Sequence, residues 1–106
     1  MPFFHFDQNN SGGSYDANEN VAPIVVIEAV DADAANDKAE KLGIYFNGVS
    51  DERDCECCGD RWYAVEDYDA EDKPDERLIL QHESWKKQGS PYAQVHFADG
   101  RKLSYS

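Results

Sequence analysis

The side chains best suited to chemistry are three cysteines that stand within four residues, Cys55, Cys57 and Cys58. Cys55 and Cys58 are separated by two residues and followed by Gly59, the pattern of a tight turn that points two thiolates at one metal ion. Zinc in a structural site takes four ligands, usually Cys and His. The turn therefore supplies half of a zinc site, or three quarters if Cys57 also binds.

Histidines are the natural source of the missing ligands. His82 is one candidate, but we expect His5 and His96 to supply them. Each lies within a predicted strand, between apolar neighbours that point to the opposite face. If the two strands are neighbours, both rings converge on the cysteine turn and zinc serves as a structural ion. In a metal-free alternative, the cysteines are small buried apolar residues at a turn. An iron–sulfur cluster usually needs four cysteines, and a thioredoxin-like thiol pair precedes a helix, whereas an aromatic strand is predicted here.

A second candidate site is the glycine-rich loop Asn10, Ser11, Gly12 and Gly13. Glycine lets a backbone approach a ligand closely, so we name these four residues as a candidate ligand-binding loop. The loop lacks the lysine and the glycine spacing of known phosphate-binding loops. A simple turn between two strands is the favoured alternative.

Charge limits the partners of the chain. Lys plus Arg total 10 against 22 Asp plus Glu, a formal net charge of -12. Duplex nucleic acid and anionic membranes are disfavoured by that charge, whereas a protein with a basic surface is attracted. We expect the interaction surface to combine acids with aromatic residues that anchor interfaces: Asp67, Asp69, Glu71, Asp72, Trp62 and Tyr68.

No residue pattern indicates an enzyme. The alternating acids that begin at Asp67 open like a calcium loop, but the positions that need Gly and Glu hold Asp72 and Leu78. Carboxylates are so numerous that no spacing singles out an acid–base pair. We therefore expect no catalytic residues.

The elements that must position these residues form one small domain, residues 1–106, of the α+β class. Strands are predicted at residues 3–6, 24–29, 61–65 and in a hairpin of 94–97 with 102–105, and residues 44–46 are expected to pair briefly. The principal helix begins at Asp31 or Asp33 and ends at Gly43. We expect a small, mostly antiparallel sheet with this helix on one face and a cysteine-containing turn.

Two stretches complete the chain. Residues 66–76 hold seven Asp or Glu against one Lys, which predicts a solvated, mobile acidic loop. Leu78–Leu80 fits either a strand or the start of a short helix that reaches Trp85. No apolar run is long enough to span a membrane. The cysteine count is odd and Cys57 is adjacent to Cys58, which favours a reducing cytoplasm over a disulfide framework.

Three blocks of the sequence resemble small proteins of tailed bacteriophages: residues 3–14 with the FDQNNSGGS run, residues 34–46, and residues 54–62 with DCECCGDRW. The resemblance covers the first two-thirds of the chain and the 95–100 hairpin, and we expect divergence at 66–76. It implies a phage accessory protein that works in the cytoplasm of the bacterial host.

Two functions follow from these features. The first is a non-enzymatic acidic module that binds a host protein and inhibits or redirects it, and one form of this module is a DNA mimic. The alternative is a small-ligand or metal-binding module in which the glycine loop, Cys55, Cys58, His5 and His96 surround one pocket.

Overall fold

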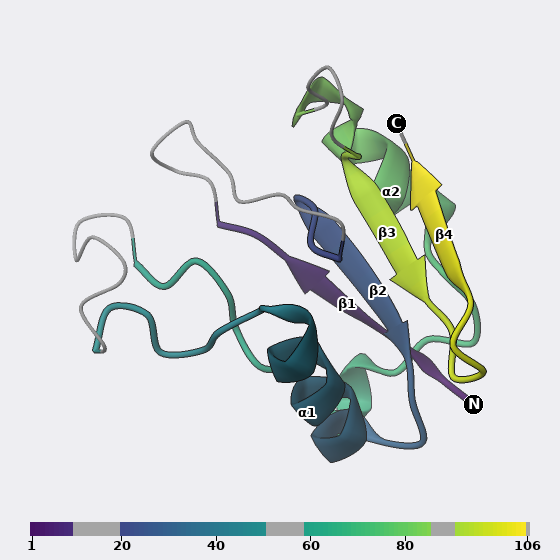
Figure 1. The fold of residues 1–106 in the computed structure, drawn as a ribbon, viewed down its shortest axis with the longest axis horizontal. Helices are drawn as coiled ribbons and strands as arrows, with labels where there is room; N and C mark the ends of the chain where they lie inside the picture. Colours follow the sequence, from purple (N-terminus) through teal and green to yellow (C-terminus); the bar gives the residue numbers. More distant parts are fainter. Residues whose placement is uncertain (10–19, 51–58, 86–90, 106) are drawn as a thin grey trace.

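The computed structural model describes residues 1–9, 20–50, 59–85 and 91–105. The strands are β1 (Phe3–Asp7), β2 (Ile24–Glu28), β3 (Ala93–His96) and β4 (Lys102–Tyr105), and they form one sheet in the order β1-β2-β3-β4 (Figure 1). β1 with β2 and β3 with β4 pair antiparallel, whereas β2 and β3 run parallel. The predicted α+β fold with a mostly antiparallel sheet is confirmed.

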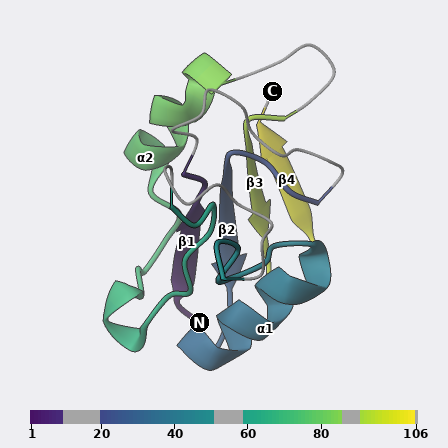
Figure 2. The ribbon, with the colours of Figure 1, turned by 90° about the vertical axis from the view of Figure 1, so that its left-hand side faces the viewer.

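Helices lie on both faces of this sheet (Figure 2). The principal helix α1 (Ala32–Leu42) covers one face, and the short helix α2 (Glu76–Gln81) lies against the other. Two 3-10 turns accompany them, η1 (Asp67–Asp69) and η2 (His82–Trp85). Of the two possibilities for residues 78–80, the helical one is confirmed.

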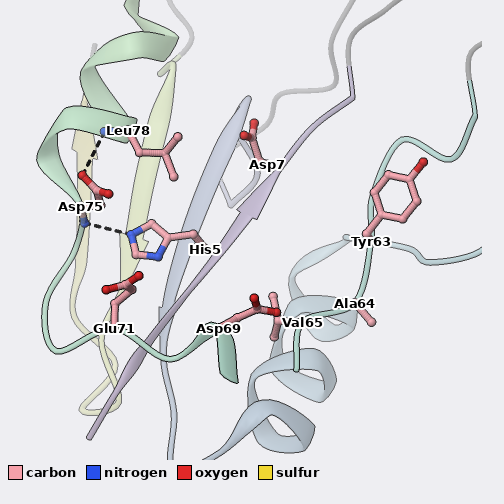
Figure 3. Close-up of a pocket in the computed structure, with 9 residues that line it drawn as sticks. All are labelled: His5, Asp7, Tyr63, Ala64, Val65, Asp69, Glu71, Asp75 and Leu78. Atoms are coloured by element: carbon pink, nitrogen blue, oxygen red, sulfur yellow. Dashed lines mark hydrogen bonds between the residues drawn. The ribbon is translucent and has the colours of Figure 1, made fainter. Parts of the chain in front are cut away.

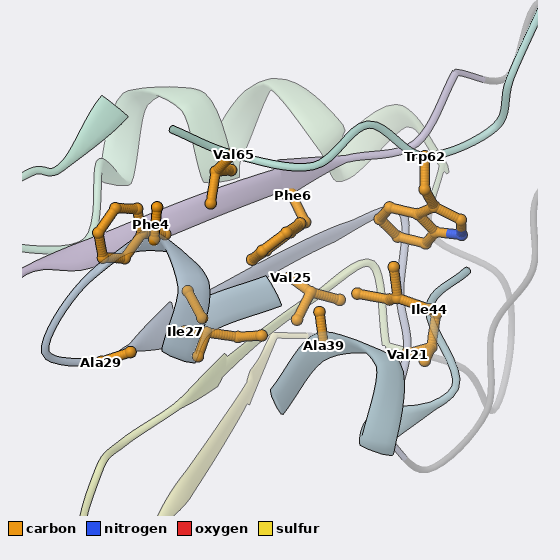
Figure 4. Packing of buried hydrophobic residues seen from close by; sticks show 12 residues of the cluster. Phe4, Phe6, Val21, Val25, Ile27, Ala29, Ala39, Ile44, Trp62 and Val65 are labelled. Atoms are coloured by element: carbon orange, nitrogen blue, oxygen red, sulfur yellow. The ribbon is translucent and has the colours of Figure 1, made fainter. Parts of the chain in front are cut away.

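Strand alternation separates two apolar clusters. On the α1 face, Phe4 and Phe6 of β1 pack with Val25 and Ile27 of β2 (Figure 4). On the α2 face, the cluster consists of Phe3, Ile24, Val26, Ile79, Tyr92, Ala93 and Val95. Both faces of β2 are covered, which accounts for its unbroken β-branched sequence.

The predicted boundaries of α1 are confirmed in detail. The Asp31 carboxylate accepts a hydrogen bond from the Ala34 N–H at 2.9 Å, and Gly43 ends the helix at φ 112°. This left-handed conformation is costly for residues with a Cβ. Ala35 and Ala39 are fully buried, and their small side chains let the helix backbone lie close to the sheet.

Two predicted strands are wrong. Residues 61–65 run extended but form no strand. At Val65, the Asn36 side chain makes the hydrogen bonds that a neighbouring strand would make. Its Nδ2 donates to the Val65 carbonyl at 3.0 Å, and its Oδ1 accepts from the Val65 N–H at 2.9 Å. Residues 44–46 form no strand either, because the Ile44 N–H bonds back to the Ala39 carbonyl at the end of α1.

The acidic stretch 66–76 is exposed apart from the partly buried Pro74, yet it is attached to the rest of the molecule. Glu71 exchanges two backbone hydrogen bonds with Phe3 at the outer edge of β1. The Asp67 carboxylate accepts from the Ala32 N–H at 2.9 Å. This stretch therefore connects the start of α1 to the edge of the sheet.

Candidate functional site

A pocket of about 360 Å³ opens beside β1, between the extended residues 63–65 and the start of α2 (Figure 3). We call it the acidic pocket, because four of its lining residues carry carboxylates and none is Lys or Arg. Its lining consists of His5, Asp7, Tyr63, Ala64, Val65, Asp69, Glu71, Asp75 and Leu78. β1 contributes the first two residues, and the acidic stretch contributes three of the carboxylates.

His5 is fixed at the wall of the acidic pocket by a backbone donor. The Asp75 N–H donates to His5 Nε2 at 2.9 Å (Figure 3), so Nε2 holds no proton and the neutral ring carries its proton on Nδ1. Burial lowers the pKa of His5, and the carboxylates of Asp75, Glu71 and Asp7 oppose that effect only in part. His5 is therefore a neutral positioning group, and the negative charge of the pocket is not cancelled by it.

His82, at the start of η2, holds the pocket residue Asp7 in place. Its Nε2 is 2.6 Å from Asp7 Oδ1, and its Nδ1 bonds to the Leu78 carbonyl at 2.9 Å. Since a carbonyl only accepts, Nδ1 is a donor here. The hydrogen bond to Asp7 raises the pKa of His82. Sequence reasoning considered His82 only as a further candidate zinc ligand and missed its contact with Asp7, because the two residues are 75 positions apart along the chain.

The lining of the acidic pocket has the features of a site for a cationic side chain. Leu78 and Val65 provide apolar surface between the carboxylates, and Tyr63 provides an aromatic ring. This combination fits a lysine or arginine side chain, whose stem contacts apolar groups while its charge meets carboxylates or an aromatic face.

The residues of the predicted interaction surface lie in and beside the acidic pocket, with the exception of Trp62. Asp69 and Glu71 line the acidic pocket, while Asp67 and Asp72 are exposed beside it and Tyr68 is 85% exposed. Trp62 is wrong as a surface residue, because it is 1% exposed and packs beside Ile44 in the apolar cluster of the α1 face (Figure 4). The next residue, Tyr63, is 58% exposed and lines the acidic pocket instead.

The two histidines predicted to share a zinc site are not brought together. β2 separates their strands. His5 pairs with Val26, whereas His96 pairs with Ile27, and neighbouring residues of a strand face opposite sides. His5 therefore lies on the α2 face and His96 on the α1 face, so one metal ion does not reach both.

The remaining predicted ligands, Cys55, Cys57 and Cys58 and the loop residues Asn10, Ser11, Gly12 and Gly13, lie outside the described residues. Within residues 1–9, 20–50, 59–85 and 91–105, no group of three or more His, Cys, Asp or Glu side chains is arranged to hold a metal ion. In the same ranges no helix is long and apolar enough to cross a membrane.

Fold and site together define a small α+β domain with an acidic pocket at one edge of its sheet. The chain belongs to the family described as Domain of unknown function (DUF7296), which matches residues 1–106. No curated protein and no solved structure matches the chain.

Proposed function

We propose that the protein is a phage accessory protein that binds a basic segment of a host protein in the bacterial cytoplasm, without enzymatic activity. The observation that carries this proposal is the acidic pocket, where Asp7, Asp69, Glu71 and Asp75 surround an apolar and aromatic lining. The phage origin rests on the resemblance of the three sequence blocks.

The occupant that fits the pocket is a Lys or Arg side chain of the partner. A net charge of -12 attracts a basic partner over the whole surface, and the pocket gives that attraction one location. Tyr63 and Tyr68, both exposed, are placed to bury aromatic area around the inserted side chain. Aromatic residues at the centre of an interface contribute much of its affinity.

The proposal is tested by capture of bacterial proteins on the immobilised protein at low and at high salt. We expect a partner whose binding segment is rich in Lys or Arg, and whose binding weakens with salt. Glu71→Gln removes a pocket charge without removing a described side-chain hydrogen bond, and Tyr63→Ala removes the ring. Each is expected to weaken binding by about tenfold.

Glu40→Gln is the matched control, because it makes the same charge change at an exposed position of α1, on the other face of the sheet. The proposal fails if no partner is captured at either salt concentration, or if Glu40→Gln weakens capture as much as Glu71→Gln. Capture of a partner without a basic segment also counts against it.

A DNA-mimic form of this function adds one requirement, that the partner binds nucleic acid. Its basic groups would then recognise carboxylates in place of phosphates. Competition separates the two forms: DNA added to the preformed complex displaces the protein if both use the same basic surface. A partner that holds DNA and the protein together would exclude mimicry and leave the interaction function intact.

Zinc at the cysteine turn stays a prediction. Because His5 and His96 face opposite sides of the sheet, the two together would not complete the site. Metal analysis of protein purified without chelator tests it, and Cys58→Ser should lower any zinc content. Unmodified protein without metal would overturn it. A closed four-ligand site would make the ion structural.

A further inference from the structure

A second pocket, of about 320 Å³, lies on the α1 face at the far side of the sheet from β1. We call it the basic pocket. Three of its lining residues are Lys or Arg, a fourth is His, and none is Asp or Glu. The lining consists of Asn20, Lys38, Leu42, His96, Phe97, Gly100, Arg101 and Lys102. In a chain with 22 acidic and 10 basic residues, such a lining is a local reversal of charge.

The cationic groups come from three separate elements. Lys38 projects from α1, and its ammonium donates to the Phe97 carbonyl at 3.0 Å. An ammonium has three N–H donors, so this bond orients Lys38 and leaves two for a ligand. Lys102 begins β4, beside His96 in the register of the sheet.

Arg101 is held at the mouth of the pocket. Its Nε donates to the Asp99 carboxylate at 2.7 Å, and its guanidinium lies over the Phe97 ring, 4.9 Å from the centroid. The next residue back, Gly100, has φ 94°, and a Cβ there would meet nothing within 4 Å. Gly100 lines the basic pocket, so the glycine leaves open space there that a side chain would occupy.

The charged groups around His96 show that the basic pocket is locally cationic. The Nε2 of His96 bonds to the Asn20 carbonyl at 3.0 Å, so Nε2 carries the proton. The charged side chains that act on its ring are Lys38 and Lys102, whereas those that act on His5 and His82 are carboxylates. Burial lowers the pKa of His96 most, the hydrogen bond to the Asn20 carbonyl opposes that effect, and the two lysines lower the pKa further.

We propose that the basic pocket binds a small oxyanion of the phosphate class, held by the ammonium groups of Lys38 and Lys102 with Arg101 at the mouth. A dianionic phosphate satisfies several cations better than a carboxylate does. The pocket volume lies at the small end of ligand sites, roughly 300–1,000 Å³. A polyanion is disfavoured, because the net charge of -12 acts on every phosphate that extends beyond the pocket.

The test is an NMR titration of the whole protein with inorganic phosphate, at constant ionic strength set by chloride. We expect saturable shifts at Lys38, His96 and Lys102 in the millimolar range or tighter. Bound anion favours protonated His96, so the pKa of His96 should rise with phosphate present. A second arm uses glycerol phosphate. Tighter binding of glycerol phosphate assigns the pocket to a phosphorylated metabolite, and tighter binding of inorganic phosphate assigns it to the free ion.

Lys38→Gln and Lys102→Gln should each weaken phosphate binding by about tenfold or more. Lys102 is exposed on β4, so its variant keeps the test valid if Lys38→Gln disturbs folding. Lys41→Gln is the matched control, since it removes the same charge from an exposed position of α1 outside the pocket. The proposal is overturned if phosphate causes no shifts beyond those of chloride, or if Lys41→Gln weakens binding as much as Lys102→Gln does.

Discussion

At the residue scale, two histidine hydrogen bonds connect α2 and η2 to β1: His82 bonds to Asp7, and His5 accepts from the Asp75 N–H. The contributions of these two histidines to stability depend on pH in opposite directions. The hydrogen bond to Asp7 raises the pKa of His82 above its ordinary 6.5. Its stabilising contribution is therefore complete below pH 6.5 and lost as the pH rises through the folded-state pKa. Burial lowers the pKa values of His5 and His96, so each resists protonation and destabilises the fold as the pH falls below 6.5.

His82→Gln is expected to destabilise the protein more at about pH 6 than at about pH 8, with a difference of about 1 kcal/mol, since Asp7 is half exposed and partly screened. Urea unfolding of both proteins at the two pH values measures it. Asp7→Asn removes the same ion pair and should reproduce this difference. An equal loss at both pH values would show that His82 contributes through packing alone.

Trp62 and Tyr63 are adjacent aromatic residues with opposite roles. Trp62 is 1% exposed and Tyr63 is 58% exposed. We expect Trp62→Ala to lower the free energy of unfolding by about 3–5 kcal/mol, because it leaves a large cavity, and Tyr63→Ala to change it by less than about 0.5 kcal/mol. Urea unfolding gives both values. Similar losses in the two variants would contradict this assignment of core and surface.

At the element scale, the contact between α1 and the extended residues 61–65 depends on one side chain. Asn36 both donates to and accepts from the Val65 backbone. We expect Asn36→Ala to destabilise the protein by about 1–3 kcal/mol, because it leaves partly buried backbone groups without their partner. Hydrogen exchange at the Val65 amide should become faster in the same variant.

Asp37→Ala is the control for this change, since Asp37 is an exposed neighbour on α1. It should leave exchange at the Val65 amide unchanged. If Asn36→Ala also leaves that exchange rate unchanged, the Val65 amide is protected by burial and not by the Asn36 side chain.

Local elements could be predicted from the sequence because their signals are local. The Asp31 cap, the Gly43 stop and the turn at Asp99–Gly100 each follow from a few neighbouring residues. The parallel pairing of β2 with β3 could not, because their paired residues are about 70 positions apart along the chain. Alternation places His5 and His96 relative to their own neighbours, but only the sheet order and register show that they face opposite sides.

The binding sites illustrate the same limit. The acids of 66–76 are visible in the sequence as a charged run, so part of the acidic pocket was found. The basic pocket was missed, since Lys38 and Lys102 are far apart in sequence and each looks like an ordinary surface residue. Their proximity depends on the β3–β4 turn that meets α1 through the Phe97 carbonyl.

At the scale of the whole molecule, charge is separated across the sheet. The acidic pocket lies at the β1 edge and the basic pocket on the α1 face near β3 and β4. A host protein at the first and a small anion at the second would therefore attach without competing for surface. Because the overall charge is -12, mutual repulsion of carboxylates opposes the compact state throughout.

Salt should therefore stabilise the protein. The radius of gyration is 13.0 Å. The screening length is about 30 Å at 0.01 M salt and about 3 Å at 1 M, so at low salt repulsion extends across the whole molecule and at high salt only neighbours interact. We expect the thermal midpoint to rise by several degrees between these limits in sodium chloride. A midpoint that falls with salt would show that attractive ion pairs outweigh the repulsion.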